Sequence, residues 1–339
     1  MRQQRTGVVE DAPTEPRGAS SRSERAVIAN DAAAALLRTL KQRGYRFVTP
    51  TRDTYHLNRL RRPLGGQSTL TDVFGWSRRF QPGMLPLAVL ELMQSGGLVA
   101  SRRFGLPRSN LACASVDDLL LFHTSLSSHS ADAVFFGPDS YRFVALLKRH
   151  AHRLPLGARV VDIGSGTGAG ALALIALRPD LRLVVADINP AALRLARINF
   201  AAANAEAEFI LSDGLAGVAG RTDAVIANPP YLGGSIGRTY RRGGGPLGAD
   251  LTIDWVRQAA ARIEWGGMIL LYTGSAISGG SDLVRGAIEP TLIESGFSVD
   301  YAEVDPDIFG RTLWLPAYRN VDRIAAVTMV ATKSSAERV

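Results

Sequence analysis

The tetrapeptide Asn228-Pro229-Pro230-Tyr231 has the residue types of a clamp for a planar NH2 group. It follows the apolar run 223–227, which we interpret as a buried strand, so it lies where parallel sheets place their reactive groups. The Asn228 side-chain oxygen can accept one N–H, the Pro229 carbonyl can accept the other, and the Tyr231 ring can stack on the planar group. We therefore predict that all four residues are catalytic in methylation of an sp2 nitrogen, and that Asn228 and Tyr231 also bind the substrate. The alternative is a rigid turn that ends the strand.

A glycine-rich loop ahead of this motif has the composition of a nucleotide site. Residues 160–170 read Val-Val-Asp-Ile-Gly-Ser-Gly-Thr-Gly-Ala-Gly and lead from an expected strand into an expected helix. The glycines permit positive φ and a close approach of the backbone to a ligand, and a helix N-terminus attracts a carboxylate or a phosphate. Asp187 ends the next expected strand, where an acidic side chain can accept bonds from ribose hydroxyls.

The loop by itself also fits the sequence fingerprint of a dinucleotide-binding loop. Other residues are therefore needed to distinguish between the two ligands. Asp162 stands two residues before the first glycine, where it can meet a positive amino group, and the Asn-Pro-Pro-Tyr motif has no role in hydride transfer. Both favour S-adenosylmethionine as the methyl donor. Asp213 is placed to accept a bond from the adenine amine, unless Asp213-Gly214 is only a turn. The predicted cofactor-binding residues are Asp162, Gly164, Ser165, Gly166, Thr167, Gly168, Asp187, Ile188, Asp213, Gly214 and Asn228.

A second glycine-rich stretch, residues 232–245, follows the motif and contains three arginines. The glycines imply mobility and the arginines imply an anionic contact, so we predict a lid that becomes ordered when substrate binds. Its predicted substrate-binding residues are Arg238, Tyr240 and Arg241. The alternative is a passive, flexible insertion.

From residue 133 onward, expected strands and helices alternate at the spacing of βαβ units. No long helix separates the last two strands, so we expect them to pair antiparallel. This pattern predicts an α/β fold with a seven-stranded, Rossmann-like methyltransferase sheet whose last strand is antiparallel. The expected strands are 159–163, 183–188, 208–212, 224–227, 268–273, 297–304 and 324–332, and the expected helices are 170–177, 190–204, 251–263 and 281–295.

The chain before residue 133 has a different pattern. We expect residues 1–28 to be a disordered tail, because they are polar and aperiodic. Residues 29–132 then form a smaller, mainly helical domain for substrate recognition, and residues 133–334 form the methyltransferase domain. In the smaller domain we expect a helix over 31–44, capped by Asn30, an irregular segment over 45–82 and a second helix over 86–94. Short strands are expected over 98–101, 111–115 and 118–123, and this order of elements resembles a winged helix.

The net charge of +8 is concentrated in one part of the chain. Residues 31–108 carry thirteen cationic side chains and four carboxylates, a surplus of nine. Such a segment suggests an anionic partner, either RNA or the ribosome. The alternative is an arginine-rich surface that serves only solubility.

Composition excludes several classes of protein. The single cysteine, Cys113, rules out an internal disulfide framework and a cysteine-cluster metal site, and no metal is expected. The first 25 residues lack the apolar core of a secretory signal, and no apolar run approaches the ~18 residues of a membrane span. We therefore expect a cytoplasmic monomer that has no membrane partner and acts on a macromolecule.

The glycine loop, Asp187, Asp213 and the Asn-Pro-Pro-Tyr motif, in this order and spacing, carry a family resemblance over residues 133–334. The chain resembles class I S-adenosylmethionine-dependent methyltransferases, and within them the HemK-type protein-(glutamine-N5) methyltransferases and their small methyltransferase relatives. The resemblance implies methylation of a protein glutamine amide, as in release factors. Enzymes that methylate adenine N6 or guanine N2 in rRNA, tRNA or DNA share the motif and form the second hypothesis. A catalytically silent adaptor that binds RNA or a ribosome is the third.

The chain departs from the HemK-type pattern in two places. Those enzymes carry Pro-Arg-x-x-Thr-Glu before the glycine loop, whereas residues 136–143 read Phe-Gly-Pro-Asp-Ser-Tyr-Arg-Phe here. This stretch would close over the cofactor with Asp139 or Tyr141 as contacts. The N-terminal segment also differs from the usual small helical bundle. Both departures weaken the transfer of the release-factor substrate to this chain.

Overall fold

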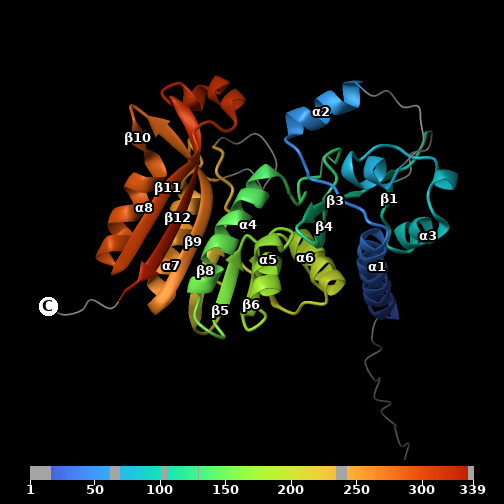
Figure 1. Cartoon of the computed structure of the whole chain (residues 1–339), viewed down its shortest axis with the longest axis horizontal. Coiled ribbons are helices and arrows are strands. Elements are labelled where there is room, and N and C mark those ends of the chain that lie inside the picture. Colours follow the sequence, from blue (N-terminus) through green and yellow to red (C-terminus); the bar gives the residue numbers. More distant parts are fainter. Residues whose placement is uncertain (1–16, 62–68, 101–104, 129, 234–242, 335–339) are drawn as a thin grey trace, which may run out of the picture.

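The computed structural model describes residues 17–61, 69–100, 105–128, 130–233 and 243–334. Its centre is a sheet in the order β11-β12-β9-β8-β5-β6-β7 (Figure 1). Strands β5 to β9 pair in parallel, whereas β12 runs antiparallel to both of its neighbours, and a short β10 pairs with β9. The predicted fold class is thereby confirmed. The strands are β5 (Arg159–Ile163), β6 (Arg182–Asp187), β7 (Glu208–Leu211), β8 (Thr222–Ala227), β9 (Ile263–Ser278), β10 (Ser281–Asp282), β11 (Phe297–Asp305) and β12 (Arg323–Lys333).

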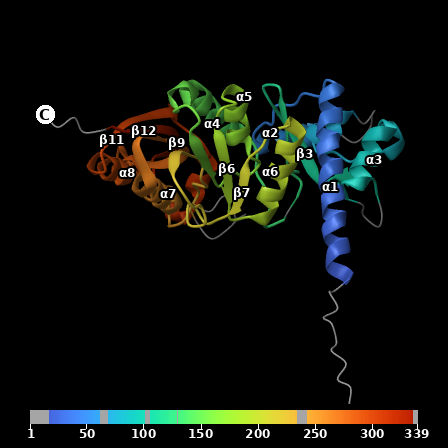
Figure 2. The same cartoon turned by 90° about the horizontal axis from the view of Figure 1, so that it is seen from below.

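Helices cover both faces of this sheet (Figures 1 and 2). Successive strand residues point to opposite faces, and along β5 Val160 joins one apolar core while Val161 joins the other. Burial on both faces explains why the central strands are apolar throughout. The helices are α4 (Pro138–His150), α5 (Ala169–Leu177) and α6 (Pro190–Ala203) on one face, and α7 (Asp250–Arg262) and α8 (Leu283–Glu294) on the other. Among the described residues, no helix combines the length and apolarity needed to cross a membrane.

The N-terminal region is mainly helical, as predicted, and it lies against α6 (Figure 2). Its apolar core, which includes Leu36 and Phe122, also takes in Ala192, Leu195 and Ile198 of α6. One helix therefore closes the core of the N-terminal region and contributes to the sheet domain. The elements are α1 (Arg17–Gln42), α2 (Arg52–Arg61), α3 (Leu87–Ser95) and two hairpins, β1 (Val99–Ala100) with β2 (Arg108–Ser109) and β3 (Leu111–Val116) with β4 (Leu119–Thr124). The likeness to a winged helix stays a prediction.

Two expectations for this region were wrong. Helix α1 begins at Arg17, so residues 17–28 of the expected tail are helical, and Asn30 lies inside the helix, where it accepts a hydrogen bond from Arg194 Nε at 2.8 Å. A polar, aperiodic stretch gives no helix signal, but extending a helix that already exists is far easier than starting one. Helix α2 falls in the segment expected to be irregular, because its residues are mostly exposed and form no apolar stripe.

Candidate active site

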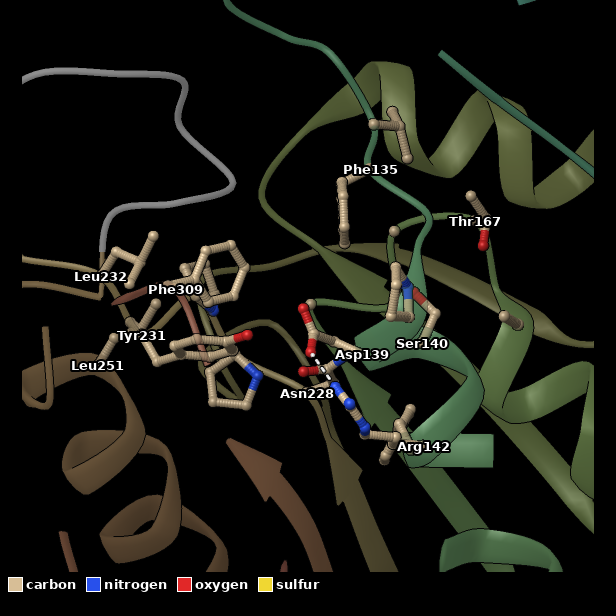
Figure 3. A pocket seen from close by; sticks show the side chains of 18 of the residues that line it. Phe135, Asp139, Ser140, Arg142, Thr167, Asn228, Tyr231, Leu232, Leu251 and Phe309 are labelled. Carbon is tan, nitrogen blue, oxygen red and sulfur yellow. Dashed lines mark hydrogen bonds and ion pairs between the residues drawn. The ribbon is translucent and has the colours of Figure 1, made fainter. Parts of the chain in front are cut away.

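A cavity of about 860 Å³ lies at the carboxyl ends of β5, β6 and β8 (Figure 3). The glycine loop lines one part of it and the Asn-Pro-Pro-Tyr motif lines another. Gly168 is the one predicted cofactor residue outside the lining: it starts α5 with φ +76°, and a Cβ there would come within 2.9 Å of Phe200. The predicted residues that line the cavity are Asp162, Gly164, Ser165, Gly166, Thr167, Asp187, Ile188, Asp213, Gly214, Asn228, Pro229, Pro230 and Tyr231.

Two buried carboxylates stand at the glycine-loop end. Asp187 accepts hydrogen bonds from the backbone N–H of Gly166 at 2.9 Å and of Asn189 at 2.8 Å, so it ties the loop to the end of β6. Asp162 is 2% exposed and accepts a 3.2 Å bond from the Ala171 N–H. Burial raises the pKa of both carboxyls, to about 8 for Asp162, where the Asp187 charge adds to the effect. A cationic ligand group would favour the ionised form of Asp162.

The first glycine of the loop leaves room for an indole ring. Gly164 has φ +61°, and a Cβ at this position would lie 2.4 Å from Cη2 of Trp255. Trp255 projects from α7 and lines the cavity, and its Nε1 is buried without a hydrogen-bond partner in the described part of the chain. Sequence reasoning missed this residue, because a tryptophan on an amphipathic helix looks like any core residue.

Asn199 of α6 joins the cofactor loop to the N-terminal region. Its Nδ2 donates to the carbonyls of Thr167 at 2.9 Å and Phe122 at 3.1 Å, and its Oδ1 accepts from the Phe122 N–H at 2.8 Å. The side chain is fully buried. Phe122 belongs to β4 and Thr167 to the glycine loop, so a single amide fixes the two elements relative to each other.

The aromatic ring of the motif is almost covered. Tyr231 is 8% exposed, and a Cβ on Gly274 of β9 would lie 2.3 Å from its Cδ2. Phe309, from the β11–β12 connection, packs edge-on against Tyr231 with ring centroids 5.9 Å apart (Figure 3). Phe309 has φ +56°, a conformation that is uncommon for a bulky residue. Stacking of Tyr231 on a substrate stays a prediction, and a planar group would have to enter beside Phe309.

An ion-pair network reaches the motif from α4. Asp139 Oδ1 accepts hydrogen bonds from Tyr272 Oη at 2.9 Å and from Arg142 Nη1 at 3.4 Å. Arg142 Nη2 continues to Asp305 at 2.6 Å. Asp139 lines the cavity, as the family resemblance suggested, whereas the Tyr141 hydroxyl accepts a bond from the Thr49 N–H instead.

Two further stretches complete the cavity, and sequence reasoning predicted neither. Residues 50–53 come from the N-terminal region, and residues 307–312 come from the β11–β12 connection. Arg311 Nε lies 3.7 Å from Asp53 Oδ2, which brings the two stretches together. No sequence motif marks either stretch.

The remaining predicted site residues, Arg238, Tyr240 and Arg241, lie outside the described residues, so the lid stays a prediction. Within the described ranges, no three His, Cys, Asp or Glu side chains gather as metal ligands would.

Part of this chain is similar to known methyltransferases. Residues 139–273 match the family model of the methyltransferase small domain. The release factor glutamine methyltransferase of Deinococcus radiodurans is 34% identical over 172 residues, which cover 48% of this chain and 58% of that protein. The ribosomal RNA small subunit methyltransferase C of Shewanella halifaxensis is 34% identical over 110 residues, which cover 32% of this chain and 29% of that protein. A solved methyltransferase from Pyrococcus furiosus aligns at 17% identity with a TM-score of 0.41, over 60% of this chain and 89% of its own.

Proposed function

We propose that this protein is an S-adenosylmethionine-dependent N-methyltransferase, because residues 139–273 match the family model of the methyltransferase small domain, in line with the resemblance found in the sequence. Its acceptor is a planar NH2 group. The observation that carries the proposal is that a single cavity contains both the glycine loop and the Asn-Pro-Pro-Tyr motif, at the ends of the neighbouring strands β5 and β8. We also propose that the protein works in the cytoplasm, as a monomer and without a metal.

The cofactor end of the cavity fits S-adenosylmethionine. The buried Asp162 carboxyl gains most from a cationic partner and would hold the ligand's amino group. Asp187 would accept bonds from the ribose hydroxyls, and Asp213 from the adenine amine. The glycine backbone allows the close approach that this requires. Bound here, S-adenosylmethionine supplies a methyl group already activated by its positive sulfur, so no nucleophilic residue is needed.

The acceptor end has to overcome the poor nucleophilicity of an sp2 nitrogen. In our proposal the Asn228 side-chain oxygen and the Pro229 carbonyl accept its two N–H bonds. These bonds orient the nitrogen and favour the charge that develops on it in the transition state. The prolyl pair keeps the acceptors rigid, since its φ angles are fixed.

A protein glutamine amide is the first candidate acceptor. With 5.9 Å between the Tyr231 and Phe309 ring centroids, a small amide can lie beside both rings. The contact is edge-on, so a planar group can lie beside the two rings but not between them. The Deinococcus relative, a release factor glutamine methyltransferase, shares the longer of the two matches and supports the same choice.

An exocyclic base amine is the second candidate. The surplus of nine cations in residues 31–108 favours it, because a nucleic acid is polyanionic. The Shewanella relative, a ribosomal RNA methyltransferase, supports it independently.

Radiolabelled methyl transfer into cell extract tests the proposal. The extract is incubated with the protein and methyl-labelled S-adenosylmethionine, then divided between nuclease and protease digestion. We expect the label to be released by protease and to survive nuclease. Release by nuclease would replace the amide with the base amine, and absence of any label above a control without the protein would reject the methyltransferase itself.

A further inference from the structure

We propose that Asp139 takes up the proton that the acceptor nitrogen loses on methylation. This role rests on the proposed function and applies equally to an amide and to a base amine. A methylated NH2 group carries one proton too many, and a carboxylate beside it is a suitable acceptor.

The carboxylate of Asp139 has one oxygen engaged and one available. Its side chain lines the cavity although the residue is only 6% exposed. Tyr272 and Arg142 both donate to Oδ1, whereas Oδ2 accepts no hydrogen bond from the residues that the structure describes. The Tyr231 hydroxyl points toward Asp139 (Figure 3). It makes no hydrogen bond of standard geometry, but burial and then the nearby Asp139 raise the pKa of this hydroxyl. The network thus fixes the carboxylate and leaves Oδ2 for a ligand.

Sheet register places this carboxylate next to the clamp. Ala227 of β8 pairs in parallel with Leu271 of β9, so Asn228 follows alongside Tyr272, the donor to Asp139. Alternation along β8 puts position 228 on the same face as Ile226, whose core cluster includes Tyr272 and α4. Asn228 and Asp139 both line the cavity, and both are labelled in Figure 3.

The proposed step balances without any further reactant. The acceptor nitrogen uses its lone pair to bond the methyl carbon, and the carbon–sulfur bond breaks with its electron pair on sulfur. Before the reaction both N–H bonds point to Asn228 and the Pro229 carbonyl. As the nitrogen becomes tetrahedral, one hydrogen leaves its acceptor, the nitrogen keeps the electron pair of that N–H bond, and the proton passes to Asp139 Oδ2. Arg142, paired with both Asp139 and Asp305, holds the carboxylate in place before the transfer.

A binding measurement tests this role without any acceptor. Sinefungin carries a protonated amine where S-adenosylmethionine carries its methyl-sulfonium, and S-adenosylhomocysteine carries only a thioether there. An amine at that position can donate to Asp139 Oδ2, so the wild-type protein should bind sinefungin about tenfold more tightly than S-adenosylhomocysteine. Asp139→Asn preserves an Oδ1 acceptor for Tyr272 and Arg142 but replaces Oδ2 by a donor, and it should abolish that preference.

Asp307→Asn is the matched control, because Asp307 also lines the cavity but belongs to the β11–β12 connection. It should leave the preference for sinefungin unchanged. An Asp139→Asn protein that keeps the preference would overturn the proposal. Loss of S-adenosylhomocysteine binding in the Asp139→Asn protein would also overturn it, since Asp139 would then only support the fold. A wild-type protein that binds the two ligands equally well would overturn it too.

Methyl-transfer kinetics separate this inference from the proposed function. With the extract fraction that takes label, Asp139→Asn should lower the maximal rate about 100-fold while the KM for that fraction changes little. A normal rate in the variant rejects the role of Asp139 alone, whereas absence of wild-type transfer rejects the proposed function on which that role rests.

Discussion

At the level of single residues, Gly164 is constrained both by its backbone and by its neighbour. Its φ of +61° disfavours any side chain, and Trp255 occupies the space of a Cβ. Gly164→Ala should therefore cost about 2–4 kcal/mol of unfolding free energy and weaken S-adenosylmethionine binding at least ~10-fold. Gly157→Ala is the control: its φ is +66°, but nothing lies within 4 Å of the place that its Cβ would take, so it should cost only about 1–2 kcal/mol. Stability is measured by denaturation and S-adenosylmethionine binding by calorimetry. If both variants lose the same stability and Gly164→Ala binds normally, a steric clash between residue 164 and Trp255 is contradicted.

Asp162 should make the stability of the ligand-free protein depend on pH. Its pKa is raised from 3.8 to about 8 by burial, so the folded state holds a proton that the unfolded state releases. This contribution is fully present below pH 3.8 and is lost as the pH rises through about 8. The unfolding free energy should thus decline across that range, and Asp162→Asn should flatten the decline in denaturant titrations.

The same shift predicts that S-adenosylmethionine binding at pH 7 releases a proton, because the ligand's amino group favours the carboxylate. Calorimetry in buffers of different ionisation enthalpy measures this release directly. If the wild type and Asp162→Asn release the same number of protons on binding, the amino group of S-adenosylmethionine does not contact Asp162.

At the level of elements, Asn199 should be essential to the link between β4 and the glycine loop. Asn199→Ala leaves the N–H and carbonyl of Phe122 and the carbonyl of Thr167 without partners. We expect a loss of about 2–4 kcal/mol in unfolding free energy and weaker cofactor binding. Asn110→Ala is the control, since that exposed amide makes a single 3.3 Å bond to Gly97, and it should change stability by less than about 0.5 kcal/mol. If chemical denaturation gives similar losses of unfolding free energy for Asn199→Ala and Asn110→Ala, the Asn199 hydrogen bonds do not stabilise the link between β4 and the glycine loop.

The sequence predicted the elements of the sheet domain well, because pattern and chemistry agree there. Strand β5 was placed at its observed bounds, since buried parallel strands are continuous apolar runs. Helix α2 and the start of α1 were missed because both are polar. Tyr55 of α2 is buried against Trp76, a contact that no local pattern reveals, and the start of α1 only extends a helix that already exists. Trp255 and Phe309 were missed for a related reason: they reach the cavity from distant segments, and only the folded chain brings them together.

At the level of the whole molecule, the basic character of residues 31–108 should appear as salt-sensitive binding of RNA. Exposed cations at the end of α1, Lys41 and Arg43, form no ion pair within the described residues. Replacing both by Gln should reduce the slope of log affinity against log salt by about 2. Lys148→Gln is the control, since Lys148 pairs with Asp117 outside this segment, and it should change the slope less. If the affinity for RNA does not change with salt concentration, the surplus of positive charge serves only solubility.

The central claim is that Asn228 holds the nitrogen that receives the methyl group, and one comparison tests it most directly. Methyl transfer into extract and S-adenosylmethionine binding are measured for the wild type and for Asn228→Ala. We predict that the variant binds S-adenosylmethionine nearly as well as the wild type but transfers its methyl group about 100-fold more slowly or not at all. A variant that transfers methyl at close to the wild-type rate would contradict it.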